Sequence, residues 1–166
     1  MRPYDDRGEP VPALLWMWAR RLPAVAADLV EKADMTRQYL YLTVGAARPE
    51  LAWIRTRVAS WARALGLRAE QREDIVLAVD EATANAVEHA YPAGSGTVTI
   101  FASGDRDGHM VNVIVSDEGT WRPRDYEPTA QGRGMRMMRK LADVFNRFHD
   151  DRGTTVVLRF ATAVLV

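Results

Sequence analysis

The sequence predicts an α+β two-layer sandwich, in which a mixed, mainly antiparallel sheet is covered by helices on one face. Residues 97–102 and 110–116 alternate as strands do, and a turn rich in Gly and Asp joins them, which is typical of a hairpin. A second hairpin pattern closes the chain, and segments with helical periodicity lie before and between the hairpins. Hairpins interleaved with helices pack as a sheet with a helical layer.

Composition limits the classes of function. The 166 residues suffice for one domain with a real core, and 22 Lys and Arg balance 22 Asp and Glu, so direct attraction to nucleic acid or to a membrane is not expected. The chain has no cysteine, which excludes disulfides and Cys-ligated zinc, and its three histidines lack metal-ligand spacing. No apolar run is long enough to span a bilayer, and the acidic N-terminus does not fit a secretory signal. A cytoplasmic protein is therefore expected.

The first part of the chain reads as an extension of a main domain, with 1–36 as helical extension and 37–166 as domain. Residues 12–34 predict one helix or two, because Pro23 should kink or divide the pattern. This segment either packs on its own domain or docks on a partner or second subunit, since its two tryptophans are costly to leave in water. The predicted apolar stripe consists of Leu14, Trp18, Leu22, Val25 and Leu29.

The main domain divides into alternating elements. Pro49 suits the first turn of a helix that Gly66 ends, and residues 92–96 stop the helix that follows. Residues 122–131 are polar, contain two prolines and have no periodicity, so they predict a mobile loop. The expected order is a strand at 38–44, helices at 49–65 and 69–91, strands at 97–102 and 110–116, a helix from Gly132, and strands at 144–149 and 154–160.

The second of these helices carries the most informative stretch, residues 74–91. Glu81 and Asn85 lie four residues apart on one edge, with Glu88 and His89 one turn further on. An acid, an amide and an imidazole among alanines leave room for a ligand, although an ordinary solvated helix would show the same pattern. The adjoining apolar face consists of Ile75, Val79, Ala82, Ala86 and Ala90.

Two later segments are informative only in combination. Gly132-Arg133-Gly134 opens a helix, where glycines let a backbone approach phosphates and free N–H groups attract anions. Asp117 ends a strand and is followed by Gly119, so its carboxylate could accept a hydrogen bond from an exocyclic amine or merely cap a turn. The Rossmann and P-loop spacings are both absent.

The ordered set of motifs resembles the GHKL ATPase superfamily. The set runs from DEATANAVEHAY through Asp117-x-Gly119-x-Trp121 and Gly132-x-Gly134-Met135 to GTTVVL in the last strand. The first and last of these look most like the anti-sigma factor serine/threonine kinases of bacteria, and the resemblance covers about residues 38–160. It implies a histidine-kinase-like ATPase fold that binds ATP and Mg²⁺.

The resemblance also implies a role for each motif residue. Asn85 would hold the Mg²⁺ that bridges the ATP phosphates, and Glu81 would be the general base. Asp117 would bind the adenine amine with Gly119 giving the base room, and Thr154 would support the adenine through its hydroxyl.

Residues 122–131 would form the ATP lid by the same resemblance. Gly132, Arg133 and Gly134 would line the phosphates, with Met135 beside them. His89 would flank the nucleotide or serve as a surface or capping residue. The lid is short, so the γ-phosphate would be reached by Arg122, Arg124 or Arg133.

Two functions of different class follow. The first is an ATP-dependent serine/threonine protein kinase that inhibits a sigma factor, phosphorylates an anti-anti-sigma (STAS-type) partner and forms a homodimer. The second is a non-catalytic module that binds sigma or another regulator, which the short lid and the N-terminal extension favour. A histidine-kinase fragment is less expected, because His89 is the first histidine and no phosphoacceptor histidine precedes the domain. Gyrase-like and chaperone ATPases are much longer.

Overall fold

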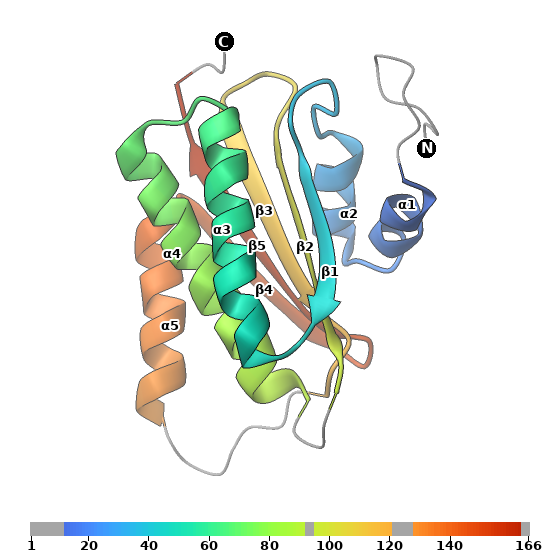
Figure 1. The fold of residues 1–166 in the computed structure, drawn as a ribbon. Helices are drawn as coiled ribbons and strands as arrows, with labels where there is room; N and C mark the ends of the chain where they lie inside the picture. The colour runs from blue at the N-terminus through green and yellow to red at the C-terminus, as the bar shows by residue number, and fades with distance from the viewer. Residues whose placement is uncertain (1–11, 92–94, 121–127, 164–166) are drawn as a thin grey trace.

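Five strands form one antiparallel sheet in the computed structural model, which describes residues 12–91, 95–120 and 128–163 (Figure 1). The spatial order is β1-β2-β3-β5-β4, and every neighbouring pair is antiparallel. The crossover places β5 in the interior and leaves β1 and β4 as edges. The bounds are β1 Leu40–Gly45, β2 Thr97–Gly104, β3 Met110–Asp117, β4 Val144–Asp150 and β5 Gly153–Ala161.

Helices cover both faces of this sheet (Figure 1). Helices α3 (Arg48–Ala64), α4 (Ala69–Asn85) and α5 (Pro128–Leu141) lie on one face, and a π-helical turn at Ala86–Ala90 continues α4. Helices α1 (Ala13–Ala19) and α2 (Ala24–Glu31) lie on the other. The predicted α+β fold, with helices on one face, is confirmed for the main domain, and the N-terminal helices add a third layer. No helix within the described ranges has the length and apolar character needed to cross a bilayer.

The alternation of strand side chains explains how one sheet serves two cores. In β2, Val98 and Ile100 pack under α3 and α4, whereas Phe101, the residue after Ile100, packs under α1 and α2. All three side chains are fully buried. Both faces of the central strands are therefore apolar, as expected of a sheet with a helical layer on each side.

The N-terminal helices pack on their own domain, which decides between the two interpretations of this segment. Pro23 divides them as predicted, and the Trp18 ring lies 5.8 Å from Tyr41 and 6.2 Å from Phe101, centroid to centroid. The predicted stripe is wrong at Leu14 and Val25, whose exposed fractions are 67% and 49%. The residues that face the sheet are Leu15, Ala19, Leu22, Ala26 and Val30. Two of these are alanines, which let the helices approach the sheet closely.

Helix α5 begins earlier than expected. The sequence predicted a loop at 122–131 and a helix from Gly132, but the helix starts at Pro128. Proline is a loop signal inside a polar run, and it is also favoured in the first turn of a helix, where its missing N–H costs nothing. The remainder of the predicted loop, 122–127, lies outside the described residues.

Candidate functional site

A small pocket lies between α4, α5 and the sheet. It brings together four of the predicted site residues, Asn85, Asp117, Met135 and Thr154, although they are far apart in the sequence. The free space in it is about 20 Å³, which is room for roughly one water molecule. The other described residues that line it are Ala82, Ala86, Val115, Met138, Arg147 and Val156.

The sheet end of the pocket is built around the carboxylate of Asp117. Its Oδ1 accepts hydrogen bonds from the backbone N–H of Gly119 at 3.0 Å and of Thr154 at 3.3 Å, so one side chain joins the ends of β3 and β5. Thr154 Oγ1 lies 2.9 Å from His149 Nδ1 on the edge strand. Burial raises the pKa of Asp117, and the two hydrogen bonds and the nearby His149 and Arg147 only partly oppose that rise.

Two glycines allow the backbone around Asp117 to pack this closely. A Cβ on Gly119 would lie 2.0 Å from the carbonyl oxygen of Ala90, at the end of the π-helical turn. A Cβ on Gly153 would lie 2.0 Å from the carbonyl oxygen of Asp117, and its φ of +134° is one that other residues rarely adopt. Gly119 is thus needed for close packing between the end of the π-helical turn and the end of β3. This role is separate from the one that the resemblance implies, which is to leave room for the adenine base.

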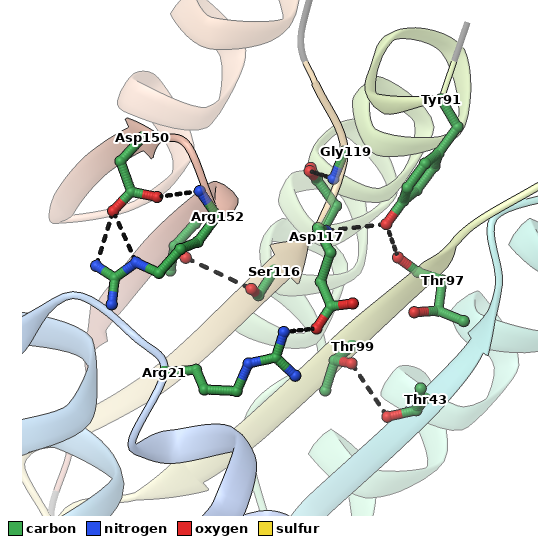
Figure 2. Close-up of polar contacts among 12 residues, drawn as sticks. Arg21, Thr43, Tyr91, Thr97, Thr99, Ser116, Asp117, Gly119, Asp150 and Arg152 are labelled. Atoms are coloured by element: carbon green, nitrogen blue, oxygen red, sulfur yellow. Dashed lines mark hydrogen bonds and ion pairs between the residues drawn. The ribbon is translucent and has the colours of Figure 1, made fainter. Parts of the chain in front are cut away.

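Tyr91 supports the same strand end from outside the pocket (Figure 2). Its hydroxyl donates to the carbonyl oxygen of Thr97 at 2.6 Å and accepts from the N–H of Glu118 at 2.9 Å. Burial raises the pKa of the Tyr91 phenol, which keeps it a donor. On the opposite side, Arg21 of the α1–α2 connection pairs with the exposed Glu118 carboxylate (Figure 2). Sequence reasoning missed both contacts, because they depend on how distant segments pack.

At the helix end of the pocket, Asn85 of α4 lines the pocket, and Glu81, which is not among the described residues that line it, lies beside Asn85 against the backbone of α5. A Cβ on Gly134 would lie 2.9 Å from Glu81 Oε2 and 3.6 Å from Asn85 Nδ2. Burial raises the pKa of Glu81, and the neighbouring charges of Asp80 and Glu88 raise it further. Asp80 itself is paired with Arg55 of α3, with 2.8 Å between Nη2 and Oδ1. A carboxylate with a raised pKa beside an amide and a helix backbone is a suitable arrangement for proton transfer near a bound anion.

Other predicted residues lie away from this arrangement. His89 is not among the described residues that line the pocket; its side chain is 11% exposed, with Nε2 3.7 Å from Glu88 Oε2. The i→i+5 geometry of the π-helical turn explains this, because residues four apart no longer stack as they do in an α-helix. Arg133 is exposed, and a Cβ on Gly132 would meet nothing within 4 Å. Arg122 and Arg124 lie outside the described residues.

Arg147 is the pocket residue that sequence reasoning missed. It lies on β4 opposite Val156 of β5, and the same face of the strand pair carries Phe145 and Thr154. The available signal was the alternation in β4. Phe145 packs against the core, and a residue two positions on shares its side of the sheet.

The possible ligands for a metal in this pocket are few. The described residues contain no group of three or more acidic or histidine side chains that could hold an ion. Asn85 lines the pocket and would offer one amide oxygen to an ion there. A Mg²⁺ ion that enters with a phosphorylated ligand needs only one or two protein ligands and takes the rest from phosphates and water. The residues present therefore fit a nucleotide-borne ion better than a dedicated protein cage.

Comparison with known proteins identifies the family of the domain. The model of the histidine kinase-like ATPase domain matches residues 45–160. The crystal structure of the RsbU and RsbW domains of Rv1364c from Mycobacterium tuberculosis is similar, with a TM-score of 0.61 and 26% sequence identity over 76% of this chain. That similarity covers 34% of the other chain, so the present chain spans about a third of its length. The blue-light activated histidine kinase EL346 of Erythrobacter litoralis also matches, with a TM-score of 0.49 and 27% identity over 69% of this chain and 41% of that one.

The family match and the similarity to the Rv1364c domains confirm the resemblance to the GHKL superfamily and are consistent with the RsbW-like anti-sigma kinases. They support a nucleotide-binding, kinase-like module. The matched range includes β2–β5, α3–α5 and every residue of the pocket described above. The chain belongs to the histidine kinase-like ATPase domain family.

Proposed function

We propose that this protein is an ATP- and Mg²⁺-dependent serine/threonine kinase that acts as an anti-sigma factor. It would bind a sigma factor, phosphorylate a STAS-type anti-anti-sigma partner and act as a homodimer. The observation that supports this most is the pairing of two chemistries across one pocket. Asp117, Thr154 and Asn85 line the pocket, and Glu81 lies next to it, beside Asn85 and Gly134.

The sheet end would bind the adenine. The Asp117 carboxylate accepts a hydrogen bond from the exocyclic amine of adenine, and Thr154 supports the base through its hydroxyl. Asp117 is 6% exposed and already held by two backbone N–H groups, so its orientation is fixed before a ligand arrives. Such preorganisation lowers the entropy cost of binding.

The helix end would position the phosphates. Asn85 would hold Mg²⁺, which when bound neutralises phosphate charge, and Gly132, Arg133, Gly134 and Met135 would border the phosphates. Glu81 would accept the proton of the serine or threonine hydroxyl, and the rise in its pKa brings it closer to the working pH of a general base. His89 remains a prediction as a residue flanking the nucleotide.

Nucleotide entry would require movement of α5. The free space of about 20 Å³ is far smaller than a purine, and Met135 and Met138 of α5 form one wall. Methionine side chains adapt readily, and the sheet wall is held by hydrogen bonds that α5 does not make. We therefore expect α5 to move while Asp117 stays in place.

Phosphotransfer tests the proposal. Wild type, Glu81→Gln and Asp80→Asn are incubated with labelled ATP, Mg²⁺ and candidate STAS partners. Wild type should transfer phosphate, and Glu81→Gln should lose about 10²- to 10⁴-fold in rate while still binding ATP. Asp80→Asn is the matched control, measured at a pH well above the titration of Glu81, because that carboxylate pairs with Arg55 instead of facing Gly134. Absence of transfer by wild type, or undiminished transfer by Glu81→Gln, would remove the kinase assignment.

A non-catalytic regulator-binding module is the second candidate, and the small pocket favours it. The two functions differ in their response to nucleotide, because a ligand of the native state must stabilise it. Calorimetry and thermal unfolding with ATP and Mg²⁺ separate them. Heat of binding and a raised Tm would support the kinase. The absence of both effects would support the module.

A further inference from the structure

Arg147 occupies a position where the fold alone would favour an apolar side chain. It lies on the side of β4 that faces α5, in register with Val156, and two positions from Phe145, which packs on the core. It is partly buried and lines the pocket together with Asn85, Asp117 and Thr154. A partly buried guanidinium among these pocket residues places a fixed hydrogen-bond donor where a ligand of Asp117 would sit.

Arg147 interacts electrostatically with Asp117 at the sheet end of the pocket. Its charge and that of Asp117 act on one another: each stabilises the ionised form of the other, although burial opposes this at both. No comparable interaction joins it to Glu81, whose raised pKa comes from burial, Asp80 and Glu88. A ligand that meets Asp117 would therefore meet Arg147 beside it.

The two groups together complement one edge of adenine. That edge presents an amine donor, N6, next to a ring acceptor, N7, and another ring acceptor, N1, lies on the amine's other side. A carboxylate only accepts hydrogen bonds when ionised, and a guanidinium only donates them. Guanine presents an acceptor, O6, where adenine has its amine, so it would bring an oxygen against the Asp117 carboxylate.

We propose that Arg147 contacts the nucleotide base and determines specificity, donating a hydrogen bond to a ring nitrogen of adenine beside the amine that Asp117 holds. This inference rests on the proposed ATP binding and adds a residue to it. Phosphate binding by Arg147 is the competing role, since Asn85 lines the same small pocket.

The experiment compares the affinities of wild type, Arg147→Met and Arg106→Met by calorimetry. Methionine keeps an unbranched stem and removes the charged donors. Arg106 is exposed in the turn between β2 and β3, so its replacement controls for loss of one positive charge. The ligands are adenosine, ADP, ATP, 7-deaza-ATP and 1-deaza-ATP, and thermal unfolding shows that each variant is folded.

Arg147→Met should weaken the binding of adenosine, ADP and ATP by a similar factor of roughly 10 to 100. This is the usual effect of losing a hydrogen bond to a charged group. One deaza analogue should bind wild type correspondingly more weakly than ATP, but should match ATP on Arg147→Met. A loss that grows from adenosine to ATP would assign Arg147 to the phosphates and overturn the inference, as would unchanged affinities. If wild type binds no nucleotide, the proposed function and this inference both fail. If wild type binds ATP but Arg147→Met binds it equally well, only this inference fails.

Discussion

The two ends of the candidate site are built differently. At the sheet end, Asp117 is buried, and its hydrogen bonds to Gly119 and Thr154 join two strands. At the helix end, Glu81 and Asn85 are only partly buried, and their neighbour Gly134 belongs to a separate helix. Under the proposed function, base recognition would therefore be tied to the stability of the fold, whereas phosphate positioning would depend on packing between helices that can change.

The largest expected effect comes from the sheet-end glycines. Gly153→Ala places a Cβ 2.0 Å from the carbonyl oxygen of Asp117 at a φ of +134°, so backbone must shift. We expect a loss of about 3 kcal/mol or more in the free energy of unfolding, from strain and overpacking together. Denaturant unfolding measures it. A loss below about 1 kcal/mol would mean that this end is as adaptable as the helix end.

Side-chain truncation should show the same contrast. Asp117→Ala leaves two buried N–H groups without their acceptor, and we expect a loss of about 1–3 kcal/mol after allowing for relief of the buried charge. Asn85→Ala, on the partly buried helix edge, should change stability by only about 0.5 kcal/mol while abolishing Mg²⁺-dependent ATP binding. Chemical unfolding and calorimetry on both variants test this. Asp117→Asn, which keeps an acceptor oxygen, is the control.

The pH dependence of transfer probes the helix end. A general base must be deprotonated, so the rate should rise with pH, with a midpoint above 4.5, the ordinary pKa of glutamate. Burial contributes most to this shift and Asp80 contributes next, so Asp80→Asn should move the midpoint to lower pH. Single-turnover rates over a pH series measure both. A midpoint that Asp80→Asn leaves in place would argue that another group titrates.

The smallest effect concerns Gly132. It lies inside α5, and an added Cβ would meet nothing within 4 Å. Gly132→Ala should therefore raise the free energy of unfolding by about 0.5–1 kcal/mol, because alanine restricts the unfolded chain and favours helix. If Gly132 also borders the phosphates, ATP affinity should fall in the same variant. Increased stability with unchanged affinity would confine the phosphate site to Gly134 and its neighbours.

Much of the fold follows from local pattern. Alternation in 110–116 predicted the observed strand, although both of its faces are buried, and helical spacing around Ile75 and Val79 predicted the observed buried face of α4. The N-terminal stripe failed at Leu14 and Val25, where the adjacent Leu15 and Ala26 are buried instead. Hydrophobicity alone favours Val25 over Ala26, although close packing on a sheet favours the smaller side chain.

The site was only partly predictable for a related reason. Asn85, Asp117, Met135 and Thr154 carry motifs that can be read in order, and they line one pocket. Tyr91 and Arg147 act through partners more than 25 residues away or on a neighbouring strand, and no local pattern specifies those partners. The shift of His89 depends on a π-helical turn, which periodicity at 3.6 residues per turn does not represent.

The helices α1 and α2 have a consequence for self-association. They already bury Phe101, Ile114 and Val157 on their side of the sheet, so the area that would drive two sheets to stack face to face is used within one molecule. A homodimer of this chain would have to join through another surface, such as the unpaired edge of β1. The two sheets would then meet edge to edge instead of face to face.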